Sequence, residues 1–402
     1  MIVVPSRMGR LNKRALLARL QRLGLASRAD LAKSLGMSQP TAGKIADELL
    51  AQGVIEEVEE DVALRSSLDG GAARLGRPAR MLRLNRSEPR FIAVQLGVAE
   101  TRLAALPVGA DDEDCWAVAF ETPGTAEAWV KQLRIAARDV AVKDCLGVLV
   151  SAPGIVDEPA GRVVFSPNLH WTEGGELTLL LQRVWAVPVA LVQEERALAL
   201  GQQAMAPDNE DFLLVDFGEG VGGAVVVGGR LYHHPLPISG ELGHTPVSGN
   251  LRSCGCGAVG CLETLASTRG LMLSLGAANG ETVRTWAALQ RRVAEAGIEP
   301  WLFQTLEATA MIVAGALNVL GLRRVVVTGS LNDLPEGVLD QLRSRIVEGA
   351  LWGRFGEVTV EAAPRRRTAG LVAVGIDRLV LPMTSSTAYP PRSRGRRARP
   401  RA

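Results

Sequence analysis

The sequence is poor in aromatic side chains and in cysteine, and its charges nearly cancel. Aromatic residues make up 4% of the 402 residues, and the formal net charge is only +2. With 47% hydrophobic residues the chain can still bury sizeable cores, which excludes a disordered protein, and its length allows two or three domains. Because the net charge is near zero, any nucleic-acid surface must come from basic residues that are grouped locally.

The scarcity of cysteine and of long uncharged runs also limits the cellular compartments in which the protein could work. Five cysteines, of which Cys115 and Cys145 stand alone, argue against a disulfide framework and predict a reducing, cytoplasmic environment. The longest uncharged stretch, Ala308–Leu322, is too short to span a bilayer and is interpreted as a buried helix. Residues 1–10 lack the apolar core of a secretory signal, so we expect no membrane association.

The remaining three cysteines follow a histidine within the stretch 240–267, in the order H-x9-C-x-C-x4-C. One imidazole and three thiolates are the donor set of a closed tetrahedral zinc site, and intervening glycines let the loop fold back. The alternative is a group of buried small hydrophobes or a disulfide. Four protein donors leave no position for a water molecule, so the predicted Zn²⁺ is structural. The predicted ligands are His244, Cys254, Cys256 and Cys261.

Two carboxylates flank this array, Glu241 three residues before the histidine and Glu263 two residues after the last cysteine. The stretch from Gly240 to Glu263 resembles the signature of the ROK family, whose members are bacterial sugar kinases and sugar-responsive transcription factors. The resemblance extends from about Leu11 to about Leu381. It implies that the histidine and the cysteines bind zinc, and that Glu241 and Glu263, with His244 nearby, contact sugar hydroxyl groups.

The N-terminal part is predicted to hold three short helices. Apolar periodicity indicates a helix over Leu11–Leu23, and Ser27 with Asp30 has the spacing of a capping box that begins a second helix. A third helix begins after Ser38 and ends before Gly53, which together with the second predicts a helix-turn-helix. An ordinary three-helix bundle is the alternative. The start of the third helix offers polar side chains suited to base edges and phosphates, namely Ser38, Gln39, Thr41 and Lys44.

A wing is predicted after the third helix. Val54–Val62 and Arg80–Leu84 have the pattern of two strands that pair across the Gly/Ser/Arg-rich segment Arg65–Pro78. Arg77, within a Gly-Arg-Pro sequence that resembles the one found in ROK repressors, is predicted to contact phosphate or the minor groove. The alternative is a solvated loop. We therefore predict a winged helix-turn-helix domain over residues 1–88.

From Phe91 onward strands alternate with helices, which is an α/β pattern. We predict a sugar-binding domain over residues 89–381, with two lobes that resemble the actin-like (RNase H-like) sugar-kinase fold and a ligand in the cleft between them. Residues 382–402 are predicted to be a basic, disordered tail, because Thr384–Ala402 holds six arginines and no acid. The strands are predicted at Phe91–Gln95, Thr101–Pro107, Trp116–Thr122, Leu146–Val150, Phe212–Phe217, Gly222–Val227 and Arg324–Thr328, with a helix at Ala126–Val142.

Four further stretches resemble the family in the predicted cleft: Ser151–Asp157, Ser166–Leu169, Gly218–Gly223 and Thr328–Ser330. Asn168 carries an amide that can accept from one sugar hydroxyl and donate to another, which is a group that sugar sites require. A loop cap is the alternative for this residue.

The phosphate side of the cleft departs from the kinase pattern. The DxGxT motif of the kinases is replaced by Gln95–Ala99, which lacks both the acid and the hydroxyl. Glu194 stands where the catalytic aspartate is expected. Glutamate is longer than aspartate by one methylene group, which displaces the carboxylate by roughly an ångström, and a displacement of that size can lower the rate about a hundredfold. Glu219 replaces a threonine of the second phosphate loop. We therefore predict no catalytic residue, with Glu194 kept as a sugar-binding group.

Together these patterns predict a sugar-responsive transcriptional regulator that acts as a repressor. The predicted partners are operator DNA and a small sugar or sugar phosphate, and a palindromic operator requires a homodimer or homotetramer. One alternative is an active ATP-dependent sugar kinase with an added DNA-binding domain. Another is a zinc-stabilised scaffold whose cleft binds no ligand.

Overall fold

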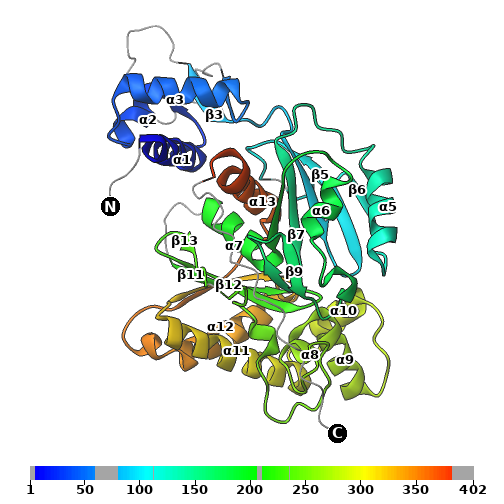
Figure 1. Ribbon diagram of the computed structural model, residues 1–402. Coiled ribbons are helices and arrows are strands. Elements are labelled where there is room, and N and C mark those ends of the chain that lie inside the picture. Colours follow the sequence, from blue (N-terminus) through cyan, green and yellow to red (C-terminus); the bar gives the residue numbers. More distant parts are fainter. Residues whose placement is uncertain (1–4, 59–79, 112, 206–210, 235, 383–402) are drawn as a thin grey trace.

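The computed structural model describes residues 5–58, 80–111, 113–205, 211–234 and 236–382, which form an N-terminal unit beside two α/β lobes (Figure 1). Each lobe is built on a five-stranded sheet, which confirms the predicted α/β fold class with two lobes. The predicted wing segment Arg65–Pro78, including Arg77, and the predicted tail from Thr384 lie outside the described residues.

The N-terminal unit contains three helices and a small antiparallel sheet of order β1-β3-β2. The capping box is confirmed, because the Ser27 hydroxyl accepts from the Asp30 backbone N–H (3.1 Å) and the Asp30 carboxylate accepts from the Ser27 N–H (3.3 Å). The first helix begins earlier than predicted, at a proline that the first turn tolerates. The elements are α1 (Pro5–Leu23), β1 (Ala26–Ser27), α2 (Arg28–Ser34), α3 (Gln39–Ala51), β2 (Ile55–Val58) and β3 (Met81–Leu84).

The first lobe has the sheet order β10-β7-β4-β5-β6, with a separate β8-β9 hairpin. The prediction of a helix up to Val142 is wrong, because α5 ends at Ala136 and the following turns bring Val140 into the core. The elements are β4 (Phe91–Leu96), β5 (Glu100–Leu106), β6 (Val118–Glu121), α5 (Ala126–Ala136), β7 (Gly147–Ala152), β8 (Ile155–Asp157), β9 (Arg162–Phe165), η1 (His170–Thr172), α6 (Leu177–Gln182) and β10 (Val189–Gln193).

The second lobe has the sheet order β13-β12-β11-β14-β15. Its elements are β11 (Phe212–Phe217), β12 (Val221–Val227), β13 (Arg230–Leu231), η2 (Leu242–His244), α8 (Glu263–Ala266), α9 (Thr268–Asn279), α10 (Trp286–Ala296), α11 (Pro300–Leu320), β14 (Arg324–Gly329), η3 (Ser330–Asp333), α12 (Glu336–Gly349), η4 (Leu351–Arg354), β15 (Thr359–Ala362), α13 (Arg367–Gly375) and η5 (Ile376–Val380).

Helix α11 is buried on one face only, which corrects the prediction of a buried helix at Ala308–Leu322. Val313 and Leu317 are buried in the core of the second lobe, whereas Met311 and Val319 are 75% and 85% exposed. By length and composition α11 could cross a membrane, but its inner face packs in a protein core together with α12 and β11.

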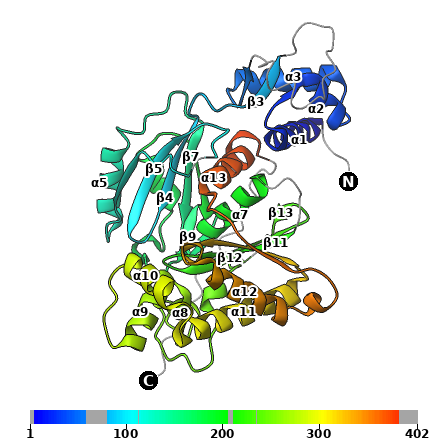
Figure 2. The same ribbon diagram turned by 180° about the vertical axis from the view of Figure 1, so that it is seen from behind.

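Helices α7 (Glu194–Met205) and α13 lie between the two sheets, as both views show (Figures 1 and 2). Residues of α13 pack in one apolar cluster with β4 and β7, and residues of α7 pack in another with β11 and β12. The two helices approach closely at glycines. A Cβ at Gly370 would lie 1.8 Å from the Ala197 carbonyl oxygen, and one at Gly201 would lie 1.8 Å from the Arg366 carbonyl oxygen.

The N-terminal unit is joined to the first lobe by α1. Leu16, Leu17 and Leu20 belong to the same apolar cluster as the core residues Phe91 and Leu381. In addition, the Arg14 guanidinium donates to the carbonyl oxygens of Leu381 (3.0 Å) and Asp377 (2.8 Å). Helix α1 therefore docks on the C-terminal end of the α/β fold, next to α13 and in contact with α7 (Figure 1).

Candidate functional site

A cavity of about 370 Å³ lies between the lobes, where several strands end and several helices begin. The carboxyl ends of β4, β7, β10 and β11 contribute to it, and so do the first residues of α7, α8 and α13. Parallel strands of an α/β sheet bring their carboxyl ends to one edge, and loops there commonly bind ligands. The volume falls within the range of about 300–1,000 Å³ that small-molecule sites occupy.

The residues that were predicted to contact a sugar come together in this cavity, although they are far apart in the sequence. Two of them are held by hydrogen bonds to neighbouring elements: Glu241 accepts from the Gln193 amide (3.2 Å), and Glu263 accepts from the Val221 backbone N–H (3.1 Å). Burial raises the pKa of Glu241, although nearby His244 opposes that shift. The lining residues from the predicted set are Asn168, Glu194, Glu241, His244 and Glu263.

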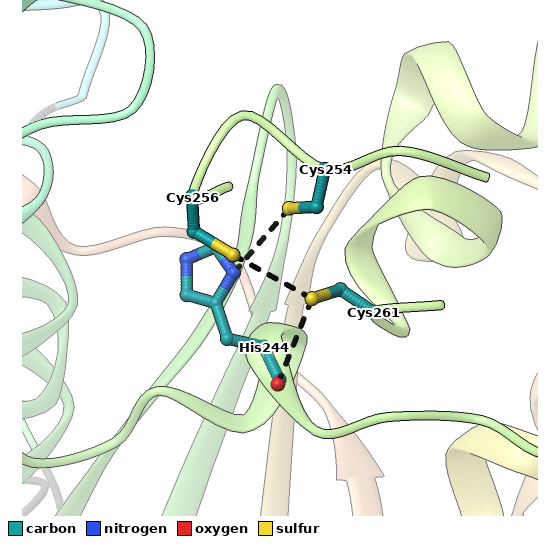
Figure 3. A group of neighbouring side chains, drawn as sticks. All are labelled: His244, Cys254, Cys256 and Cys261. Carbon is teal, nitrogen blue, oxygen red and sulfur yellow. Dashed lines mark hydrogen bonds between the residues drawn. The ribbon is translucent and has the colours of Figure 1, made fainter. Parts of the chain in front are cut away.

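The four predicted metal ligands also form one group (Figure 3), with all donor atoms within 4.8 Å of one another. The Cys254 Sγ atom lies 3.6 Å from the His244 Nδ1 atom, and the sulfurs of Cys256 and Cys261 are 3.7 Å apart. Zinc bond lengths in a regular tetrahedron place sulfur and nitrogen about 3.6 Å apart, and two sulfurs about 3.8 Å apart. The donor group therefore fits a tetrahedral metal ion.

The loop that carries the cysteines is held in shape by glycines and by polar contacts. Gly257 and Gly260 have φ values of +89° and +87°, which other residues rarely adopt. The Asn250 amide donates to the Cys261 carbonyl oxygen (3.1 Å), and the Arg252 guanidinium donates to the carbonyl oxygen of Thr264 (2.7 Å). The loop is thus tied to α8, whose first residue is Glu263.

The same histidine connects the metal group to the cavity. Its Nδ1 atom faces Cys254, whereas its Nε2 atom lies 3.7 Å from the Glu241 carboxylate. A carboxylate beside the second ring nitrogen of a metal-binding histidine fixes the orientation and the tautomer of the ring. A metal ion in the Cys₃His group would therefore fix the positions of His244 and Glu241, which both line the cavity.

Arg367, the first residue of α13, and Arg365, which precedes the helix, also line the cavity, and our sequence interpretation did not include them. Arg365 donates to both carboxylate oxygens of Asp216 (2.8 and 2.9 Å) and to the Phe217 carbonyl oxygen (3.0 Å). Arg367, 6% exposed, is hydrogen-bonded to Oε1 of Glu194. The run of three arginines at 365–367 before an apolar helix was the available signal, but their partners are more than a hundred residues away.

Glu195 is a second residue that sequence reasoning missed. Its carboxylate lies against Gly222, where a Cβ would be 2.7 Å away, and it lines the cavity beside Glu194. Burial raises the pKa of Glu195 to about 8, and the nearby carboxylates of Glu241, Glu194 and Asp216 add to that shift. The only sequence signal was the pair of adjacent acids at the start of a helix.

The predicted DNA-contacting residues lie at the start of α3, and the side chains of all four are exposed. Ser38 is the N-cap of α3: its hydroxyl accepts from the Thr41 backbone N–H (3.4 Å) and lies 2.8 Å from the Thr41 hydroxyl. Further along the helix, Asp47 is paired with Arg28 and Glu48 with Lys13. The members of the predicted set that the structure describes are Ser38, Gln39, Thr41 and Lys44.

Comparison with known proteins identifies the family. The profile of the ROK family matches residues 91–380, which is well over half of the sequence. The chain belongs to the ROK family. The resemblance inferred from the Gly240–Glu263 stretch is thus confirmed, and the cavity and the Cys₃His group both lie within the matched part of this ROK protein.

Relatives of this ROK protein include a repressor and a kinase. The xylose repressor of Caldicellulosiruptor bescii is 23% identical over 367 residues, which cover 84% of this chain and 87% of the repressor. The N-acetylmannosamine kinase of Citrobacter koseri is 30% identical over 235 residues, which cover 57% of this chain and 78% of the kinase. The repressor match therefore extends over more of the chain than the kinase match does.

A solved structure has the same fold as this ROK protein over nearly its whole length. It is described as a ROK family transcriptional regulator and a homolog of the E. coli MLC protein. The TM-score is 0.69 at 19% identity, and the match covers 92% of this chain and 96% of that chain. The similarity therefore includes the N-terminal unit as well as the two lobes.

Proposed function

We propose that this ROK protein is a sugar-responsive, DNA-binding transcriptional repressor without kinase activity. The observation that carries the proposal is that one cavity gathers the predicted sugar-binding side chains, while arginines pair with two carboxylates of the same cavity, those of Asp216 and Glu194. Residues 1–88 would bind operator DNA as a winged helix-turn-helix, and residues 89–381 would bind the sugar. The similarity to a xylose repressor over most of both chains supports this division.

On the sugar side, the proposed contacts are hydrogen bonds to ring hydroxyl groups. The Asn168 amide can donate and accept, Glu241 and Glu263 can accept, and the Nε2 side of His244 faces Glu241. Several convergent polar groups in a concave site are what a small polar ligand requires for orientation. Glu194 is a further proposed contact; its Oε1 atom is bonded to Arg367 and its Oε2 atom is buried.

The proposed metal is a structural Zn²⁺ held by His244, Cys254, Cys256 and Cys261. The separations of the donor atoms support this proposal, and four protein donors leave no open position for a reacting water. The ion would order the loop that connects Glu241 to Glu263. Burial raises the pKa of the Cys254 thiol, so a bound cation is needed to keep that ligand deprotonated.

On the DNA side, we propose that α3 enters the major groove. Gln39 and Lys44 are exposed near its start, and their side chains are free to reach base edges and phosphates. Ser38 and Thr41 bond to each other at the N-cap, which leaves their hydroxyl groups as secondary contacts. Arg77 remains a predicted contact to phosphate or the minor groove. Binding to a palindromic operator would require a homodimer or a homotetramer.

Two measurements test the proposal. The first is thermal denaturation of the full chain with a panel of pentoses, hexoses and amino sugars, since a ligand at a hundred times its Kd adds about 2.7 kcal/mol of stability. The second is a set of DNA-binding isotherms on the promoter region next to the gene, with and without the sugar that stabilises the chain. Stabilisation by a sugar with no change in DNA affinity would reject the regulator and leave only a sugar-binding protein.

The observation in favour of the alternative function, an ATP-dependent sugar kinase, is the sequence identity to the N-acetylmannosamine kinase. Kinase chemistry needs a base on the sugar hydroxyl and a cradle for the nucleotide phosphates. Here Glu194 is engaged by Arg367, and the Arg365 guanidinium lies against Gly218, where a Cβ would be 2.7 Å from it. A coupled assay of ADP release over the same sugar panel separates the two proposals, because kinases turn over at about 1–100 s⁻¹.

A further inference from the structure

A second hollow lies outside the cavity between the lobes, in the N-terminal unit. It is a groove of about 470 Å³ between the first half of α1 and the first half of α3. Both walls carry polar side chains, so the groove suits a polar or charged ligand. The polar lining residues are Arg10, Asn12 and Lys13 of α1, and Thr41, Lys44 and Glu48 of α3.

The charges of this groove are unbalanced. Three of its lining side chains are cationic and one is acidic. The acid, Glu48, is bonded to Lys13 (2.6 Å), so those two charges neutralise each other. Within the described part of the chain, neither Arg10 nor Lys44 pairs with a carboxylate, and the Arg10 Nε atom is buried without a hydrogen-bond partner. A buried donor without an acceptor costs stability, so an anion that enters the groove relieves that cost.

The position of the groove indicates which anion this is. Thr41 and Lys44 line it, and both belong to the residues of α3 that were predicted to contact DNA. A helix that lies in the major groove, which is about 12 Å wide, has a phosphate backbone on each side of it. A groove along the flank of α3 therefore lies where one of these backbones would run. A phosphodiester is negatively charged and offers only acceptors, which complements a guanidinium and an ammonium group.

We propose that the groove between α1 and α3 binds one backbone phosphate of the operator, which Arg10 and Lys44 hold together. This inference rests on the proposed DNA-binding function and deepens it, because it adds α1 to the helices that contact DNA. Phosphate contacts fix the position of a protein on the duplex but carry no direct sequence information. Arg14, about one turn after Arg10, docks α1 on η5. The same helix would thus contact the DNA backbone and the fold that bears the cavity.

The test measures how the DNA affinity of the full chain depends on salt, on the promoter region next to the gene and on scrambled DNA. Arg10→Met should lower the affinity for both DNAs to the same degree, and it should make the slope of log K against log salt less steep. The double variant Arg10→Met/Lys44→Met should reduce that slope by about 0.9, which is the contribution of one phosphate. Arg10→Lys keeps the charge and should keep most of the slope, whereas a purely structural role of Arg10 would leave the slope unchanged in every variant.

Arg19→Met is the matched control on the same helix. Arg19 also has a buried Nε atom without a hydrogen-bond partner in the described structure, but it does not line the groove. It follows Arg10 by nine residues, about two and a half turns, so it faces the opposite side of α1. We expect this variant to retain the slope of the wild type, and circular dichroism to show the same helix content in both arginine variants.

A variant with the opposite expected effect completes the test. Glu48→Gln removes the acid of the groove and frees Lys13, so both DNAs should bind several-fold more tightly. If Arg10→Met fails to fold, this variant still decides the matter, because an unchanged affinity would overturn the inference.

The outcomes also separate this inference from the proposed function. A wild type that binds neither DNA rejects the proposed DNA-binding function. A wild type that binds DNA, with slopes that stay unchanged in Arg10→Met and in the double variant, overturns the phosphate site and leaves DNA binding intact. A slope reduced by about 1.8 in the double variant would place Arg10 and Lys44 on separate phosphates and overturn the shared site.

Discussion

The buried carboxylate of Glu158 should be one of the strongest single contributors to the stability of the α/β fold. Its side chain is 8% exposed and faces two guanidinium groups, from Arg196 at 2.7 Å and from Arg378. It also accepts from the Gln193 backbone N–H (3.2 Å). The residue therefore ties together the end of β10, the first turn of α7 and η5.

Glu158→Gln keeps the shape of this side chain but leaves the two guanidinium groups without a counter-charge. Breaking a buried ion pair by removing one partner costs about 3–5 kcal/mol of stability. We therefore expect the free energy of unfolding at pH 7.5, measured by urea denaturation, to fall by about that amount. Asp340→Asn is the control, because it breaks an exposed pair with Arg343 and should cost about 1 kcal/mol or less.

The pH dependence gives a second readout of the same residue. Burial opposes ionisation of Glu158, but the charges of Arg378 and Arg196 outweigh it and lower the pKa of the carboxyl group. A lowered folded-state pKa gives stability that is present above the unfolded pKa of about 4.3 and is lost as the pH falls through the folded pKa. The difference between wild type and Glu158→Gln should therefore shrink in acid. A loss below 1 kcal/mol at pH 7.5, or a difference independent of pH, would refute the reasoning.

Three further predictions concern the metal, the helix contact and the DNA. Cys256→Ser should lower the metal content from about one zinc per chain to near zero by elemental analysis, while circular dichroism still reports the helices. Gly370→Ala should lower the free energy of unfolding by about 1–3 kcal/mol or more, because its Cβ would lie 1.8 Å from the Ala197 carbonyl oxygen. Gly315→Ala, with open space around it in α11, is the matched control and should not destabilise. Gln39→Ala should cost about 1–3 kcal/mol on the cognate operator and little on scrambled DNA, and equal losses on both would contradict base reading by α3.

Local signals in the sequence predicted the elements well. The capping box of Ser27 and Asp30 and the N-cap of Ser38 are confirmed, because capping depends on residues only three positions apart. The strand predicted at Phe212–Phe217 has the observed bounds of β11, since a short run that is apolar except for Asp216 and lies between turns is typical of a buried strand in an α/β fold. Two-residue strands such as β1 have no such signal.

Contacts between distant residues were beyond local reasoning. The pairs of Arg365 with Asp216 and of Arg367 with Glu194 join residues separated by 149 and 173 positions. Their formation depends on how the segment that begins α13 packs against β11 and α7, and the periodicity of the sequence does not predict that packing. The metal ligands were predictable for the opposite reason, because three of the four lie within eight residues and carry a rare combination of donors. Motif spacing thus predicted the site's ligands, and only the fold revealed which charges neutralise one another.

A continuous series of polar contacts connects the cavity to the N-terminal unit. Glu241 accepts from the Gln193 side chain, and the Gln193 backbone N–H donates to Glu158. Glu158 binds Arg378, whose neighbour Asp377 is bonded to Arg14 of α1. A sugar that donates to Glu241 would therefore contact the first member of this series, and the series ends on α1, the helix that docks the proposed DNA-binding domain.

The Arg14 contact can be tested without altering the cavity. Arg14→Met keeps the aliphatic stem but removes the bonds to Leu381 and Asp377, so it should leave sugar affinity unchanged and reduce the effect of sugar on DNA affinity. Coupling free energies are typically about 1–3 kcal/mol, and linkage requires the same loss in the effect of DNA on sugar affinity. Arg86→Met is the control, since Arg86 pairs with Asp111 at the same junction and, within the described part of the chain, has no bond to η5. If Arg14→Met and Arg86→Met leave the coupling equally intact, the docking of α1 on η5 does not transmit the sugar signal.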